Sequence, residues 1–150
     1  AWADADRTGI TELRPGNYGF HDATQQALGP AGCSDCALRI VTTIISRPAH
    51  NRLVIDAGAK TLALDRGAHG TSLLKGFGLI PGHPEITIAR LSEEHGILEV
   101  PDSCPLEAGA RLEIIPNHAC TAINLAEHLY VLKGDQIVAR WDVAARAKVT

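Results

Sequence analysis

Residues 38–45 read Leu-Arg-Ile-Val-Thr-Thr-Ile-Ile, and six of these eight residues are β-branched. Such side chains are stiff, and they pack better on a pleated strand than on a helix. A Pro-Ala-His-Asn turn follows at residues 48–51, and the β pattern resumes at 52–56 with Arg-Leu-Val-Ile-Asp. These segments predict two neighbouring strands that begin a β domain.

The rest of the chain continues this pattern of short strands. Residues 85–91 alternate between apolar and polar side chains, as a half-buried strand does. Four further runs have the same character: 96–100, 111–115, 129–132 and 136–141. We expect one or two helical turns within 121–128 and a hairpin turn at Lys133-Gly134-Asp135. The spacing predicts a mainly β fold, a small antiparallel β-barrel or sandwich.

Residues 1–32 differ from the rest because they are rich in Asp, Gly, Pro and Gln. A short helix is expected at 22–28, where Gly29-Pro30 would stop it. We therefore predict a connecting segment at 1–32 and a C-terminal β domain at 33–150. The chain contains no Met, which favours a fragment or a processed piece of a longer protein.

Composition excludes several classes of function. Hydrophobic residues make up 45% of the 150 residues and charged residues 21%, values typical of a globular protein. The formal net charge of −3, without a basic run, gives no footprint for nucleic acid or an anionic membrane. No apolar stretch approaches the roughly 20 residues of a membrane helix. Without a secretion signal, the four cysteines are expected to be reduced in a cytoplasmic protein.

The sharpest local feature is Pro116-Asn117-His118-Ala119-Cys120. If the chain is extended here, His118 and Cys120 point to the same side and can converge on one metal ion. An imidazole with a thiolate favours zinc, and two protein ligands leave positions for water or substrate, as in catalytic sites. The alternative is a buried cysteine beside a hydrogen-bonded histidine.

Other motifs are less specific. Cys33-x-x-Cys36 has no second pair to complete a zinc site, and we interpret it as a loop before the first strand. The segment 14–17, Arg-Pro-Gly-Asn, could place backbone N–H groups around a phosphate or form a plain turn. The roles of Asp56–Lys60 and His95 stay open between hairpin turns and contacts with a partner subunit's site.

Taken in order, the motifs resemble the D-serine dehydratase and D-threonine aldolase family, metal-activated pyridoxal-phosphate enzymes similar to alanine racemase. The segments that carry the resemblance are Glu-Leu-Arg-Pro-Gly-Asn-Tyr (12–18), Ser-Arg-Pro (46–48), Asp-Ala-Gly-Ala-Lys (56–60), Gly-Phe-Gly (76–78), Leu-Ser-Glu-Glu-His-Gly (91–96), Pro-Asn-His-Ala-Cys (116–120) and the 130–143 end.

The resemblance implies an N-terminal (β/α)8 barrel that carries pyridoxal phosphate on a lysine, a C-terminal β domain and a homodimer. Residues 1–32 would then belong to the end of that barrel, most of which is absent from this chain. Gly16 and Asn17 fall at the family's phosphate-binding turn, and His118 and Cys120 match its two metal ligands.

The implied reaction is that of a lyase acting on D-3-hydroxy amino acids, with zinc or alternatively manganese or magnesium. Cys120 favours a D-serine dehydratase type over a D-threonine aldolase type, whose sites more often resemble His-x-Asp. None of the chain's four lysines matches the position of the family's Schiff-base lysine; they are Lys60, Lys75, Lys133 and Lys148. We therefore expect no catalytic lysine here and no activity without the missing barrel or a companion chain. A non-catalytic β domain that binds a metal or a partner is the rival interpretation.

Overall fold

The structure is a computed structural model that describes residues 9, 11, 12, 14, 16–67 and 73–148. The strands are β1 (Ile40–Ala49), β2 (Arg52–Ile55), β3 (Thr87–Leu91), β4 (Gly96–Glu99), β5 (Arg111–Ile114), β6 (His128–Lys133) and β7 (Gln136–Asp142). The helices are η1 (Asn17–Gly19), α1 (Ala23–Leu28), η2 (Cys33–Asp35), α2 (Ala59–Leu62) and α3 (Ala119–Leu125). The predicted mainly β character is confirmed.

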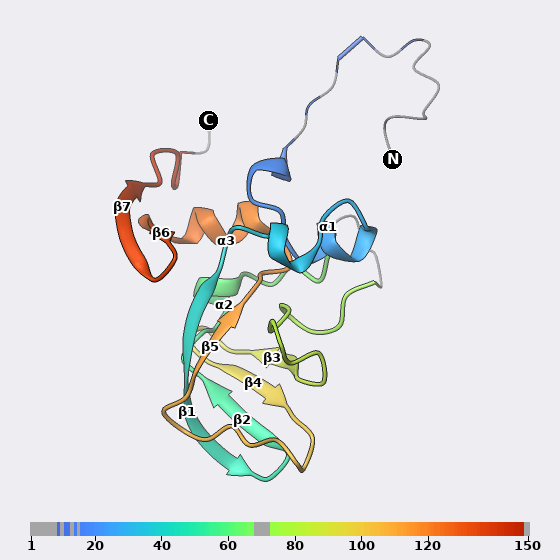
Figure 1. The fold of residues 1–150 in the computed structure, drawn as a ribbon, viewed down its shortest axis with the longest axis vertical. Helices are drawn as coiled ribbons and strands as arrows, with labels where there is room; N and C mark the ends of the chain where they lie inside the picture. The colour runs from blue at the N-terminus through green and yellow to red at the C-terminus, as the bar shows by residue number, and fades with distance from the viewer. Residues whose placement is uncertain (1–8, 10, 13, 15, 68–72, 149–150) are drawn as a thin grey trace.

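Five strands form one antiparallel sheet in the order β3-β4-β2-β1-β5 (Figure 1). Because β3 and β5 remain edge strands, the sheet is an open half-barrel. An isolated bridge between Leu79 and Ile115 extends the pairing beyond β5. The remaining strands, β6 and β7, form a separate antiparallel hairpin. The strand predictions thus hold, with bounds shifted by a few residues.

The core lies on the inner face of the half-barrel. Its centre consists of side chains that are 0% exposed and come from all five strands of the sheet, among them Ile44, Leu53, Ile88, Leu98 and Ile114. In β2 and β5, buried and more exposed residues alternate, as the two-residue period of a strand requires. Burial of each such side chain contributes about 1.5–3 kcal/mol.

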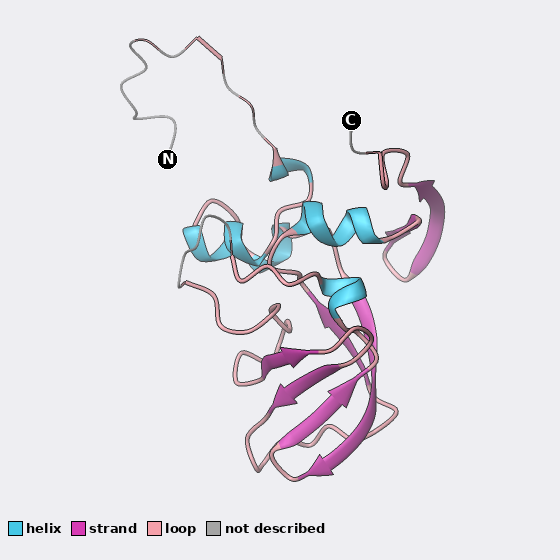
Figure 2. Cartoon of the chain, turned by 180° about the vertical axis from the view of Figure 1, so that it is seen from behind, coloured by secondary structure: helices cyan, strands magenta, loops and turns pink. Residues whose placement is uncertain are grey.

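The helices gather at one end of the sheet, opposite the β1–β2 turn (Figure 2). The helix predicted at 22–28 is confirmed as α1, with Asp22 as its N-cap and Gly29 in the left-handed conformation at its C-cap. The other predicted helix, α3, begins two residues earlier than the expected 121–128. Because Ala119 and Ala122 are buried, α3 packs by its small side chains.

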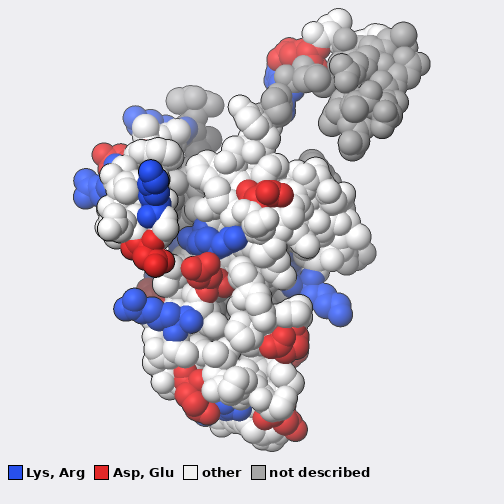
Figure 3. Space-filling model, viewed as in Figure 1, with Lys and Arg blue, Asp and Glu red and all other residues white. Residues whose placement is uncertain are grey.

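The surface carries charges of both signs. Figure 3 shows basic and acidic side chains interspersed over the visible face, in keeping with the formal net charge of −3. The hairpin β6–β7 exposes several large apolar side chains: Tyr130, Leu132, Ile137, Val138 and Trp141. Within the described parts of the chain, none of the helices has the length and apolar character needed to cross a membrane.

Candidate metal site at the junction of two helices

The polar site forms where the segment after β5 meets α1. Asn117 is 2% exposed, and its side-chain Nδ2 donates to the backbone oxygens of Asp65 (2.8 Å) and Gly76 (2.9 Å). Its own backbone oxygen accepts a hydrogen bond from Thr24 Oγ1 at 2.7 Å. Asn117 therefore ties three segments together that are distant in sequence, and it fixes the backbone immediately before His118.

Asp22 links the two helices. Its Oδ1 accepts from the backbone N–H of Gln25 at 3.0 Å, capping α1, and its Oδ2 accepts from the N–H of Ala119 at 3.0 Å, in the first turn of α3. Asn17 Nδ2 also donates to Oδ2. The carboxylate is only 1% exposed. It satisfies backbone donors at both helix N-termini, where negative charge is favoured.

This capping changes the local geometry of the predicted metal pair. His118 is the N-cap of α3 with extended backbone angles (φ −139°, ψ 110°), but Cys120 already lies in the first turn of the helix. The prediction of one extended stretch through Cys120 is therefore wrong, because Asp22 holds the N–H of Ala119 and starts a helix there. The side chains of Asn117 and Ala119 are buried, His118 is partly exposed and Cys120 is exposed. A buried structural cysteine is thus excluded at position 120.

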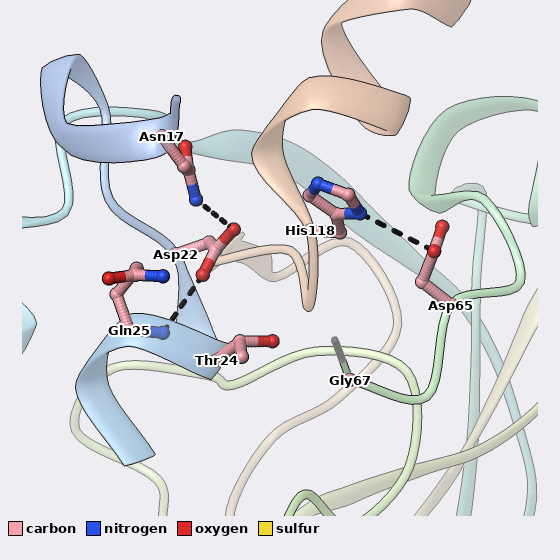
Figure 4. Close-up of a pocket in the computed structure, with 7 residues that line it drawn as sticks. All are labelled: Asn17, Asp22, Thr24, Gln25, Asp65, Gly67 and His118. Carbon is pink, nitrogen blue, oxygen red and sulfur yellow. Dashed lines mark hydrogen bonds and ion pairs between the residues drawn. The ribbon is translucent and has the colours of Figure 1, made fainter. Parts of the chain in front are cut away.

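The carboxylate of Asp65 lies beside the imidazole ring of His118. Nδ1 of His118 lies 3.5 Å from Oδ1 of Asp65, while Oδ2 of Asp65 accepts from Thr121 Oγ1 at 2.8 Å. Figure 4 shows the His118 ring with one nitrogen turned toward Asp65. His118 and Asp65 are 34% and 31% exposed, so both reach the surface of the site.

A cavity of about 320 Å³ opens beside these groups (Figure 4). It is lined by Asn17, Asp22, Thr24, Gln25, Asp65, Gly67 and His118. The lining includes two carboxylates and an imidazole, and no Lys or Arg among the described residues. Such a donor set suits a cation or a small polar molecule and disfavours an isolated phosphate.

The predicted phosphate contacts lie at the edge of this site. Asn17 lines the cavity, and its Oδ1 is buried without a hydrogen-bond partner among the described residues. Gly16 is exposed, does not line the cavity and has open space where a side chain would stand. The described residues alone do not fit the phosphate of pyridoxal phosphate. Gly16 and Asn17 therefore stay predictions.

The donors for a metal are few. Within the described ranges, no group of three or more His, Cys, Asp or Glu side chains is arranged to hold a metal ion. A closed, four-ligand structural site is therefore not built by these residues. The assignment of His118 and Cys120 to an open metal site is not tested by this arrangement, because His118 lines the cavity and the exposed Cys120 is not among its lining residues. That assignment stays a prediction.

The Cys33-x-x-Cys36 motif is structural in character. Cys33 begins the short helix η2, Cys36 is buried, and all four cysteines of the chain are unpaired. Burial raises the pKa of the Cys36 thiol, which disfavours the reactive thiolate. The interpretation as a connection into β1 agrees with this arrangement.

The turn at Asp56–Lys60 closes the end of the sheet. Asp56 accepts from Thr42 Oγ1 at 2.6 Å and from the Thr43 N–H at 2.8 Å, and these bonds lower the pKa of its carboxyl group. Lys60 is exposed and pairs with Glu94 at 2.8 Å, which raises the pKa of the lysine. These contacts account for the turn, and they bring none of its side chains into the cavity.

Most of the residues that line the cavity could not be predicted from the sequence. Asp22 stands at the start of the predicted helix 22–28, but nothing in the neighbouring sequence indicates its contact with a second helix 97 positions away. Asp65 and Gln25 belong to no recognisable motif. Only the fold brings them beside His118.

The fold and the cavity together define a β domain that presents a histidine and carboxylates at one end of a half-barrel. Residues 37–132 match the family described as "Putative serine dehydratase domain", and the chain belongs to this family. It is homologous to the C-terminal region of D-serine dehydratase, D-threonine aldolase and alanine racemase-like proteins. One solved structure of a relative, D-threo-3-hydroxyaspartate dehydratase, is described as the metal-free form.

The relatives differ in how much of them the chain covers. An uncharacterized protein of Mycobacterium tuberculosis is 40% identical over 132 residues, which is 85% of this chain and 96% of that protein. The D-serine dehydratase of Dictyostelium discoideum is 29% identical over 85% of this chain but only 34% of its own length. The chain thus spans about a third of that enzyme and nearly all of the mycobacterial protein.

Among solved structures, D-threo-3-hydroxyaspartate dehydratase from Delftia sp. HT23 superimposes with a TM-score of 0.74 and 30% identity, covering 89% of this chain and 39% of that one. Variant structures of D-threo-3-hydroxyaspartate dehydratase also match. In one a histidine is replaced by alanine, and in another, in the metal-free form, a cysteine two positions further along is replaced by alanine.

Proposed function

We propose that this chain is the metal-binding C-terminal portion of a pyridoxal-phosphate-dependent lyase that acts on D-3-hydroxy amino acids. The type we favour is a D-serine dehydratase-like enzyme, which eliminates the β-hydroxyl group with the help of zinc. The observation that carries the proposal is the placement of His118 beside a polar cavity, with an exposed Cys120 two residues further on. The same His-x-Cys spacing separates the two residues substituted in the related dehydratase.

The metal would be held by His118 and Cys120. When bound, zinc supplies Lewis-acid stabilisation of the negative charge that develops on a leaving hydroxyl group. The chain's own contribution is to hold the ligands still: Asp22 and Asn117 fix the backbone on both sides of His118 through buried hydrogen bonds. Thr24 and Gln25 provide neutral hydrogen-bonding groups in the cavity wall, where a small polar substrate would lie.

The cofactor would come mainly from elsewhere. Because none of the four lysines matches the Schiff-base position, a barrel outside this chain, either upstream or on a companion chain, would carry pyridoxal phosphate. Gly16 and Asn17 would complete the phosphate site only when that barrel is present. We propose a homodimer for the assembled enzyme and no activity for this chain alone.

A D-threonine aldolase-type reaction is the alternative within the same class. A D-threonine aldolase from Arthrobacter sp. is 30% identical over 95% of this chain, so overall similarity does not separate the two reactions. The thiolate at position 120 favours dehydration, because a softer ligand prefers zinc over manganese or magnesium.

A non-catalytic metal-binding or partner-binding domain is the second candidate. The mycobacterial relative favours it, because the chain covers 96% of that protein and that protein therefore has little room for a barrel. The two candidates share a metal site and differ in whether a barrel chain completes it.

The test combines metal binding with reconstitution. Zinc affinity would be measured by competition with a chromogenic chelator for the unaltered chain and for His118→Ala and Cys120→Ser. His50→Ala and Cys33→Ser serve as matched controls outside the cavity. We expect the unaltered chain and the two controls to bind zinc tightly, and His118→Ala and Cys120→Ser to bind it more weakly. Equal zinc affinity of the unaltered chain, the two site variants and the two controls would refute the metal site.

Activity would be measured as keto-acid release from D-serine, with and without a chelator, after the chain is combined with its barrel. Chelator-sensitive release supports the lyase. A chain that binds zinc but yields no keto acid from D-serine or aldehyde from D-threonine with any barrel supports the non-catalytic candidate.

A further inference from the structure

The carboxylate of Asp65 occupies a defined position between two groups of the α3 N-terminus. One oxygen lies 3.5 Å from Nδ1 of His118, and the other accepts a hydrogen bond from Thr121 Oγ1 at 2.8 Å. The same hydroxyl oxygen lies 3.1 Å from the backbone oxygen of His118, so its single proton is shared between this longer contact and the shorter one to Asp65. The three side chains therefore form one connected unit, in which the hydroxyl group of Thr121 orients the carboxylate toward the ring.

The loop that carries Asp65 is anchored independently of this carboxylate. The backbone oxygen of Asp65 accepts from the side chain of Asn117 at 2.8 Å. The next residue, Arg66, places its guanidinium group 5.0 Å from the ring centre of Phe77, which is 7% exposed. Both contacts are made by atoms other than the Asp65 carboxylate, so a change confined to that carboxylate leaves the loop attached.

From this arrangement we infer that Asp65 is a positioning residue that keeps the proton of His118 on Nδ1 and leaves Nε2 as the nitrogen that binds metal. A neutral imidazole carries one proton, and a carboxylate beside Nδ1 favours the tautomer with the proton there. Nε2 then presents its lone pair, and no described residue is hydrogen-bonded to it. Carboxylates behind metal-binding histidines act in this way and raise the affinity for the metal. The inference rests on the proposed function, because it presumes that His118 is a ligand.

The first test is metal affinity of the whole chain, with Co²⁺ as the probe because its thiolate bond absorbs in the near ultraviolet. Asp65→Asn keeps the size of the side chain and should weaken Co²⁺ and Zn²⁺ binding about 10–100-fold. The thiolate absorbance should persist at saturation, because Cys120 is unchanged. The matched control is Asp102→Asn, which removes another aspartate–histidine pair, His50–Asp102 at 3.2 Å, near the β1–β2 turn. Equal affinities for the two variants would overturn the inference.

The second test reads the tautomer directly and needs no metal. Nitrogen-15 chemical shifts of the His118 ring in the metal-free chain, above the pH at which the ring is protonated, should show the proton on Nδ1. In Asp65→Asn the two tautomers should mix, and in Thr121→Val, which frees the carboxylate to move, the shift should be intermediate. Identical tautomer populations in all three proteins would refute the positioning role.

The two tests separate the inference from the proposed function. If the unaltered chain binds no metal through His118 and Cys120, the proposed function fails, and the tautomer result alone decides whether Asp65 positions the ring. If the metal binds and Asp65→Asn leaves both affinity and tautomer unchanged, the proposed function stands and Asp65 is only a loop residue. Circular dichroism of each variant confirms that it is folded.

Discussion

Asn117 is the residue whose loss should do most damage to the junction of the two helices. Its side chain is 2% exposed and donates to the backbone oxygens of Asp65 and Gly76. Asn117→Ala removes both donors and leaves two carbonyl groups in a partly buried place without partners. A buried group that loses its partner costs about 1–3 kcal/mol.

The carbonyl groups of Asp65 and Gly76 are only partly shielded from solvent, so water can replace some of the hydrogen bonds that the substitution removes. We therefore expect a decrease of about 2–4 kcal/mol in the free energy of unfolding of Asn117→Ala. For a chain of this size the corresponding fall in Tm is roughly 5–15 °C. Thermal and urea unfolding, followed by circular dichroism, would measure both quantities.

The comparison needs a variant that changes the same residue type without touching the site. Asn124→Ala does so, because Asn124 is exposed on α3; its stability should change by less than about 0.5 kcal/mol. Asn117→Asp preserves side-chain size but cannot donate, so it should be at least as unstable as Asn117→Ala. A loss below about 1 kcal/mol for Asn117→Ala, or a stable Asn117→Asp, would show that these two hydrogen bonds do not hold the junction together.

Three further predictions concern other parts of the chain. In the complete enzyme that we propose, Cys120→Asp should shift metal preference from zinc toward manganese, measured as activity regained by the chelator-treated protein. An unchanged preference would count against the thiolate as a ligand. Asp56→Asn should lower stability by about 0.5–1 kcal/mol near neutral pH. The pKa of Asp56 in the folded chain lies below its ordinary value of 3.8, so the stabilisation is present above pH 3.8 and is lost as the pH falls through the folded pKa. The difference in unfolding free energy between the unaltered chain and Asp56→Asn should therefore disappear at that low pH. A difference that does not depend on pH would contradict hydrogen bonding to the carboxylate as the cause of the lowered pKa. Gly58→Ala would place a Cβ 2.4 Å from the backbone oxygen of Glu93, and it should cost about 1–3 kcal/mol in denaturant unfolding, whereas Gly19→Ala, with open space around it, should cost far less.

The strands were accessible from sequence because their signals are local. The β-branched run at 38–45 becomes most of β1, and the Lys133-Gly134-Asp135 turn joins β6 to β7 as expected. The start of α3 was missed for the opposite reason. The chain from Asn117 to Cys120 has no strong helix signal of its own, and the carboxylate that starts the helix belongs to Asp22.

Three properties could be predicted from the sequence alone: the β character of the chain, the short helix at 22–28 with its stop, and the ordered motifs that place the chain in its family. These properties depend on neighbours in the chain, where side-chain stiffness, alternation and turn residues act over a few positions. The cavity shared by Asp22, Asp65 and His118, and the hydrogen bonds by which Asn117 holds it together, follow from the folded chain and not from any local motif. Those residues are separated by tens of positions, and they meet because buried polar groups must find hydrogen-bond partners wherever the packed chain provides them.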